Sequence, residues 1–108
     1  MKKLAALAAL AAAISVAAAL AIPAFAATTV RVDDDVFRPG SLTVSKGTTV
    51  RWRWVGDDLH NVTVTRGPVK FKSATKRSGT FSKKMRRRGR YRIVCTVHPG
   101  MDMRLRVR

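Results

Sequence analysis

The residues best able to do chemistry in this chain are one cysteine, two histidines and a nearby methionine. Cys95, His98 and Met101 follow one another at intervals of three near the C-terminus. The only other histidine, His60, comes after an Asp-containing loop. One thiolate, two imidazoles and one thioether form a soft set of sulfur and nitrogen donors, of the kind that binds transition metals. The pattern therefore indicates a metal site built from two separate segments.

Copper fits this donor set better than zinc does. Two imidazoles and one thiolate in a trigonal arrangement, with a weak axial thioether, describe a blue-copper site for electron transfer. Structural zinc sites favour more thiolates and do not use thioether ligands. Taken alone, His98 is equally well explained as a surface loop residue and Met101 as a core residue. Only the combination is diagnostic.

The first 26 residues have the three-part pattern of a secretory signal peptide. Lys2 and Lys3 give a positive start, residues 4–22 are apolar, and Pro-Ala-Phe-Ala at 23–26 supplies a small-residue cleavage site. An uncleaved membrane anchor is the alternative, because the apolar stretch is nearly long enough to span a bilayer. We expect a signal peptide over 1–26 and one domain over 27–108, exported to the periplasm, the cell envelope or the medium.

A single cysteine is unusual in a small exported domain. Such domains usually contain cysteines in pairs, because their compartment is oxidising and disulfides stabilise a small core. An ordinary buried cysteine is the simplest alternative for Cys95. A role as metal ligand accounts both for the lone thiol and for the stability of a domain near the lower size limit.

The elements that must position these ligands are short strands. After residue 27 the chain consists of alternating apolar and polar runs broken by Gly, Pro and Asp, and no segment has helical spacing. Val50, Trp52 and Trp54 alternate with two arginines that we expect to face outward. About seven short strands with frequent turns predict an antiparallel sandwich or barrel. Further strands are expected near Val30–Val32, Leu42–Val44, His60–Thr65, Phe81–Met85, Tyr91–Val97 and Leu105–Val107.

Two segments are harder to assign. Residues 66–80 are rich in Gly, Lys, Ser and Thr and give no clear prediction. Residues 83–90 are strongly basic and resemble a nucleic-acid-binding patch by composition. A solvated hairpin explains them better, because Phe81, Met85 and Tyr91 keep a strand-like alternation and runs of charge are usually solvated surface. In the strand that follows, Cys95 and Val97 share the inward face.

The chain resembles the cupredoxin, or blue copper, family at several places. Residues 95–101 resemble the copper loop of that family, with the short C-x-x-H-x-x-M spacing of amicyanin. Residues 52–62 are similar to the strand and loop around the first histidine of halocyanins and plastocyanins. Residues 37–39, 47–50 and 89–91 also match, so the resemblance covers nearly all of the domain.

This resemblance implies a small antiparallel Greek-key β-sandwich that binds one type 1 copper. His60, Cys95 and His98 correspond to the equatorial ligands and Met101 to the axial one. Asn61 corresponds to the asparagine that ties the first ligand loop to the second. Two residues depart from the family: Lys83 replaces an apolar strand residue, and Met103 adds a second thioether close to the loop.

The function implied is that of a one-electron carrier and not of an enzyme. Catalytic coppers need further histidines, and both histidines of this chain are already assigned. A copper chaperone or storage protein of the cell envelope is the main alternative, because it uses similar donors. A metal-free basic module that binds anionic polymers would explain the charge but would leave the ligand set as coincidence.

The charge of the chain bears on its partners. The full sequence has a net charge of +16, and without Lys2 and Lys3 twenty basic residues against six acidic ones leave +14. Such a charge favours anionic partners. We expect an acidic redox protein and an association with anionic envelope surfaces. Export argues against nucleic acid as the physiological partner, and we expect a monomer.

Overall fold

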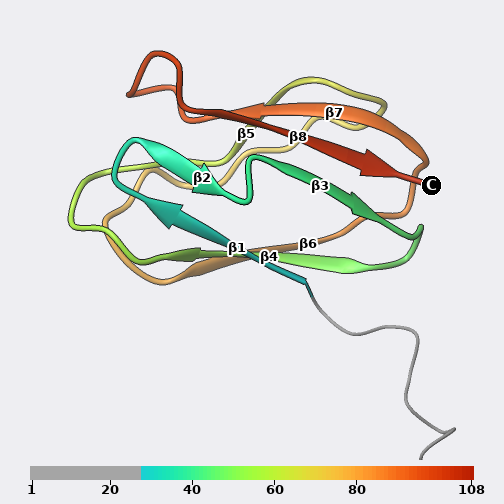
Figure 1. Ribbon diagram of the computed structural model, residues 1–108, viewed down its shortest axis with the longest axis horizontal. Coiled ribbons are helices and arrows are strands. Elements are labelled where there is room, and N and C mark those ends of the chain that lie inside the picture. The colour runs from blue at the N-terminus through green and yellow to red at the C-terminus, as the bar shows by residue number, and fades with distance from the viewer. Residues whose placement is uncertain (1–27) are drawn as a thin grey trace, which may run out of the picture.

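The computed structural model describes residues 28–108, which form two four-stranded sheets packed against each other (Figure 1). The predicted signal peptide lies outside these residues. Within residues 28–108, no helix is long and apolar enough to cross a membrane. The strands are β1 (Thr28–Asp33), β2 (Val36–Arg38), β3 (Ser41–Val44), β4 (Thr49–Trp54), β5 (Thr63–Arg66), β6 (Thr80–Lys84), β7 (Gly89–Val94) and β8 (Asp102–Val107).

Apolar and polar residues alternate along these strands, because one face of each sheet packs on the core and the other faces water. In β4, Val50, Trp52 and Trp54 are buried while Arg51 and Arg53 are exposed. The last strand, β8, has the same period and buries Met103, Leu105 and Val107. These apolar faces meet between the sheets and make one continuous core. The predicted all-β sandwich is therefore confirmed.

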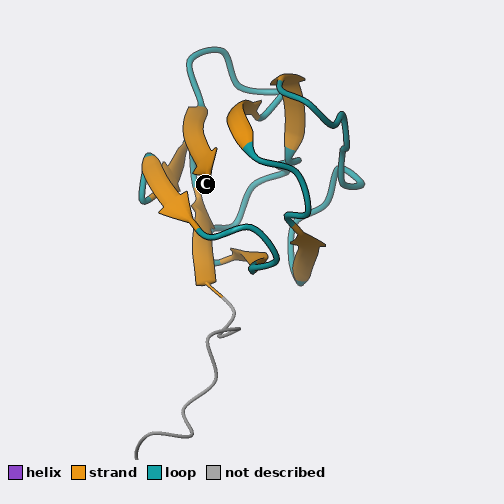
Figure 2. Cartoon of the chain, turned by 90° about the vertical axis from the view of Figure 1, so that its right-hand side faces the viewer, coloured by secondary structure: helices purple, strands orange, loops and turns teal. Residues whose placement is uncertain are grey.

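The sheet topology is mixed and not purely antiparallel. The strand orders are β2-β1-β4-β6 and β3-β8-β7-β5. β1 pairs with β4 in parallel, and β3 pairs with β8 in parallel, while the other four pairings are antiparallel. The parallel pairs arise because the chain leaves the first sheet after β2 and enters the second sheet at β3. Figure 2 shows the two layers and the loops that join them.

One feature differs from the expectations drawn from the sequence. Val97 does not face inward and is 46% exposed, because β7 ends at Val94 and the chain turns before it reaches Val97. Residues 67–79, for which there was no clear prediction, are irregular, but they are tied to the fold by bridges from Lys72 to Thr63 and from Lys76 to His60. In the same segment Phe71 packs against Trp52.

Three loops gather at one end of the sandwich, opposite the C-terminus (Figure 1). They are the β1–β2 turn, the β4–β5 loop and the β7–β8 loop, which bring together residues from three distant parts of the sequence. We call this end the metal end, for the ligands described next.

Candidate metal centre

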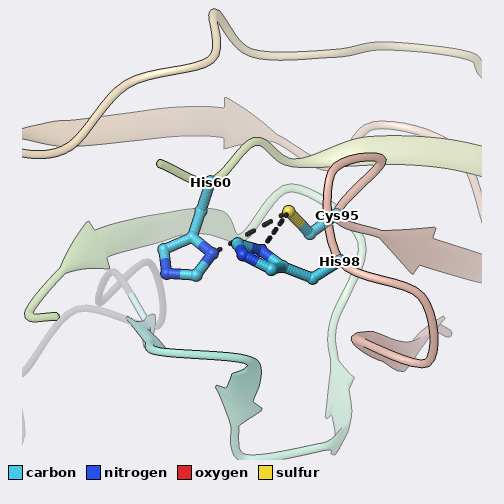
Figure 3. A group of neighbouring side chains, drawn as sticks. All are labelled: His60, Cys95 and His98. Carbon is cyan, nitrogen blue, oxygen red and sulfur yellow. Dashed lines mark hydrogen bonds between the residues drawn. The ribbon is translucent and has the colours of Figure 1, made fainter. Parts of the chain in front are cut away.

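His60, Cys95 and His98 converge at the metal end (Figure 3). The Cys95 Sγ lies 3.8 Å from His60 Nδ1 and 3.6 Å from His98 Nδ1. The candidate ligand atoms of the three residues all lie within 4.8 Å of one another. His60 and Cys95 are buried, whereas the His98 side chain is 22% exposed. The structure therefore places two imidazole nitrogens and one thiol sulfur around a common point.

Backbone pairing holds these residues in place. His60 and Lys76 exchange two backbone hydrogen bonds, of 2.9 and 3.0 Å, just before β5 begins. Cys95 follows directly after β7, and its N–H donates to the Met101 carbonyl over 2.9 Å. The Met101 N–H in turn donates to the His98 carbonyl over 3.2 Å. Gly100 permits this tight loop, since it has a φ of +83°.

Asn61 joins the two ligand loops, as the family resemblance implied. Its side-chain N–H donates to the Thr96 hydroxyl over 2.7 Å, and its side-chain oxygen accepts from the Thr96 backbone N–H over 3.1 Å. Because Asn61 follows His60 and Thr96 follows Cys95, this pair of bonds fixes the distance between the first histidine and the cysteine.

The two methionines near the loop have different surroundings. Both Met101 and Met103 are buried. The Met103 sulfur accepts a hydrogen bond from the Trp52 indole N–H over 3.4 Å, inside the sandwich. Met101 lies in the ligand loop, where its backbone is bonded to Cys95 and His98. Met103 is thus engaged with the core, whereas Met101 closes the loop that carries two of the ligands.

Acidic side chains contact the outer nitrogen of each histidine, which the sequence did not predict. Asp34 Oδ1 lies 3.0 Å from His60 Nε2. Asp35 and Asp58 each place a carboxylate oxygen 3.3 Å from His98 Nε2. The run of three Asp residues at 33–35 and the pair at 57–58 are the signals in the sequence, but they resemble ordinary turn residues.

Hydrogen bonds explain the acidity of two of these carboxyls. The pKa of Asp34 is lowered from 3.8 to about 2, chiefly by its hydrogen bond with His60 and then by the backbone N–H groups of Asp57 and Asp58. The pKa of Asp58 is lowered mainly by the Leu59 backbone N–H. Both carboxylates are therefore charged at neutral pH.

The residues at this site fit a single type 1 copper. The Nε2 atoms face carboxylates, which leaves the Nδ1 atoms directed at the sulfur, and such outer partners commonly fix the orientation of a ligand imidazole. Two nitrogens and one thiolate from these residues match the trigonal donor set of blue copper. A fold of two packed β-sheets with this His–Cys–His group defines a cupredoxin.

The sequence comparison gives the family. Residues 25–108 match the family described as copper binding proteins, plastocyanin/azurin family. The chain therefore belongs to this copper-binding family, and the His60, Cys95 and His98 group fits a single type 1 copper. A comparison with curated protein sequences found no match.

Several solved structures are similar to this chain. A reduced Cu(I) form of an amicyanin variant has a TM-score of 0.69 and 26% identity, with 83% of this chain and 89% of amicyanin covered. A purple cupredoxin from Nitrosopumilus maritimus has a TM-score of 0.68 and 19% identity, with 75% and 99% covered, which shows the fold alone. A copper-containing nitrite reductase from Thermus scotoductus SA-01 has a TM-score of 0.67 and 25% identity, with 77% of this chain covered. This chain spans only 22% of the nitrite reductase.

Proposed function

We propose that this chain is an exported electron carrier that transfers single electrons through one type 1 copper. The observation that carries the proposal is the direction of both histidine Nδ1 atoms toward the buried Cys95 sulfur. Copper supplies a one-electron couple when it is bound in such a set. The similarity to an amicyanin variant whose structure is a reduced Cu(I) form supports a copper that changes its oxidation state.

Rigid ligand positions favour electron transfer over copper delivery. Transfer is fast when the ligands move little between the two oxidation states. His60 and Cys95 are buried, and Asn61 ties their two loops together through Thr96. A protein that hands copper to another molecule needs ligands that can be reached and exchanged, so the buried pair argues against a chaperone.

The exposed edge of His98 is the proposed route for electrons. It is the only one of the three convergent ligands with appreciable exposure, and Val97 and Pro99 beside it are exposed. A redox partner can therefore approach the imidazole closely without displacing any other ligand. Redox encounters are small and transient, so this limited surface is sufficient.

Met101 is the proposed axial ligand. It follows His98 by three residues in the tight ligand loop, and its side chain is buried. Met103 is the alternative, but its sulfur already accepts the Trp52 N–H. The proposed ligand set is therefore His60, Cys95, His98 and Met101.

An independent catalytic activity is not part of the proposal. The sequence contains two histidines, and both belong to the His–Cys–His group. A further copper with histidine ligands would need residues that this sequence lacks. The similarity to nitrite reductase covers less than a quarter of that protein, so it does not extend the proposal to nitrite reduction.

Export is proposed from the signal-peptide pattern of residues 1–26, with the cupredoxin domain at 27–108. The proposed partner is an acidic redox protein, because a charge of +14 attracts anionic molecules over long distances. The single cysteine agrees with export, since a thiolate bound to copper is not free to form disulfides.

Titration of the purified domain with Cu(II) tests the proposal. Wild-type protein should develop the intense visible absorption of a Cu(II)–thiolate bond at one copper per chain, and bound copper should raise the unfolding temperature. Cys95→Ser should remove the colour and keep the fold, as judged by circular dichroism. A colourless Cu(II) complex, or colour that survives in Cys95→Ser, would contradict the assignment.

A further inference from the structure

Five arginines cover the outer face of the sheet β3-β8-β7-β5, outside the three loops of the metal end. The four in β7 and β8 alternate with the buried residues of their strands, so their side chains point away from the core. The fifth, in β5, is exposed and pairs with an arginine of β7. No lysine lines the hollow over this face. We call this surface the arginine face, and its residues are Arg66, Arg90, Arg92, Arg104 and Arg106.

Strand register places these charges directly opposite one another. Arg90 pairs with Arg106, and Arg92 pairs with Arg104, across β7 and β8. Opposed residues in a sheet have Cβ atoms about 5 Å apart, and like charges there are destabilising. On the edge strand, Arg66 pairs with Arg92. The sheet thus holds guanidinium groups together against their mutual repulsion.

Few carboxylates neutralise this surface. Asp102 contacts Arg92 over 3.0 Å, and it is the only acidic residue that lines the hollow over the face. The other five acidic residues of the sequence lie at 33–35 and 57–58, at the end of β1 and in two loops of the metal end. Charge is therefore separated along the molecule, with the carboxylates around the histidines and the arginines on the sheet.

The arginine face is hollowed, and the charged residues that line the hollow are mainly basic. A depression of about 700 Å³ is lined by all five arginines together with Ser41 and Thr43 of β3. Hydroxyls and guanidinium groups are both hydrogen-bond donors, and guanidinium matches phosphate oxygens in a two-pronged geometry. The two unesterified oxygens of a phosphodiester can accept from different guanidinium groups, so one phosphodiester group can bridge two opposed arginines.

We propose that the arginine face binds a linear phosphodiester polymer of the cell surface, an inference that rests on the proposed export of the chain. The polymer lies in the hollow and places successive phosphates between the opposed arginines of β7 and β8. Arginine in place of lysine gives each phosphate two parallel hydrogen bonds. Binding here leaves His98 free, because the hollow and the ligand loops are lined by different residues.

A polymer fits this surface better than a lipid bilayer does. The large apolar residues exposed among residues 28–108 are Val55, Leu59 and Val97, and all three lie in the loops of the metal end. The arginine face thus presents nothing to insert between lipids, whereas peripheral membrane binding gains much of its strength from buried apolar side chains. Its concave shape also suits a chain more than a plane.

Binding of a short glycerol phosphate polymer to the copper-loaded protein tests the inference. Arg90→Gln with Arg106→Gln should weaken binding roughly ten-fold. It should also reduce the slope of log affinity against log salt, by about 0.7 for each phosphate group that the variant no longer binds. The matched control is Arg51→Gln with Arg53→Gln, which removes the same charge from exposed positions of β4 on the other sheet. The control should bind almost as tightly as wild type.

Several outcomes would overturn the inference. Equal losses of affinity in both double variants would mean that the net charge of the protein, and not the arginine face, determines binding of the polymer. Tighter binding to poly-glutamate, to a single-stranded oligonucleotide or to anionic phospholipid vesicles would assign the face to another ligand. The visible copper absorption is recorded for every sample, and it should be unchanged in Arg90→Gln with Arg106→Gln. A protein without copper colour that still binds the polymer would refute the electron-carrier proposal and leave this one standing.

Discussion

Asp34 Oδ1 lies 3.0 Å from His60 Nε2, on the side of the imidazole away from the Cys95 sulfur. The same carboxylate accepts the backbone N–H groups of Asp57 and Asp58 at 3.0–3.1 Å. One side chain of the β1–β2 turn therefore orients a ligand ring and anchors the loop that carries it. A carboxylate that is hydrogen-bonded to a ligand imidazole also makes that imidazole a stronger electron donor to the metal.

Asp34→Asn should raise the reduction potential of the copper. Asparagine keeps an oxygen that accepts the hydrogen bond from His60, but it removes the negative charge. That charge stabilises Cu(II) more than Cu(I), so its loss favours the reduced ion. We expect a shift on the order of 60 mV, which corresponds to a ten-fold change in the relative affinity for the two ions. Voltammetry measures the shift. Asp33→Asn is the control, since Asp33 contacts Arg38 and the Asp34 backbone N–H but no ligand, and an asparagine oxygen can still accept that N–H. An equal shift in both variants would refute a specific role for Asp34.

Gly56→Ala should reproduce this shift by a different route. A Cβ at Gly56 would lie 2.6 Å from Asp34 Cγ and 2.8 Å from its backbone N, so the β1–β2 turn must move away. The carboxylate would then move out of reach of His60, and the potential should rise. Gly40→Ala is the control, because its Cβ would meet only the Phe37 carbonyl at 3.9 Å. An unchanged potential in Gly56→Ala would show that the bond between Asp34 and His60 is unimportant.

Met101→Leu and Met103→Leu should affect different properties. Loss of an axial thioether should raise the reduction potential in Met101→Leu, with copper still bound. Met103→Leu should leave the potential nearly unchanged and lower the free energy of unfolding by about 1 kcal/mol, because the buried Trp52 N–H loses its acceptor. Voltammetry and urea unfolding separate the two effects. A larger change of potential in Met103→Leu would reverse the assignment of the axial ligand.

Electron exchange with small reagents should depend on charge in two ways. An anionic reagent should react roughly ten-fold faster at low salt than at high salt, because the net charge attracts it and salt of 0.1 M screens beyond about 10 Å. Asp35→Asn with Asp58→Asn should accelerate this reaction further, since both carboxylates adjoin His98. Stopped-flow rates are compared with those of a cationic reagent, and potentials are measured for both proteins. Equal salt effects for the two reagents would exclude steering.

Tyr91 should make the stability of the fold depend on pH in the alkaline range. Burial raises the pKa of Tyr91 above its ordinary value of 10.0. The unfolded chain therefore loses this proton first, and stability falls as the pH rises above 10. Tyr91→Phe loses the 2.8 Å bond to the Arg87 carbonyl, worth about 1 kcal/mol. The difference in free energy of unfolding between wild type and Tyr91→Phe, measured by urea unfolding, should shrink between pH 9 and 11. A constant difference would contradict the raised pKa of Tyr91.

The sequence predicted the features of this protein that are local in the chain. The period of two in β4 and β8 is visible residue by residue, because a sheet with one buried face imposes it. The ligand loop was predicted because it too is local in the chain. The short spacing of Cys95, His98 and Met101 limits where their donor atoms can lie. The choice of His60 as the remaining nitrogen ligand followed from there being no other histidine.

Only the tertiary structure revealed the contacts between distant segments. Asp34 and His60 are 26 residues apart, and nothing in a turn-like run of Asp residues indicates which of them will reach a ligand. The opposed arginines of β7 and β8 likewise depend on strand register, because a shift of one residue would turn every side chain to the other face. Val97 faces solvent because β7 ends earlier than its alternating pattern does. Periodicity along one strand fixes which side chains are buried, but the neighbours of each side chain are fixed by how the strands and loops pack together.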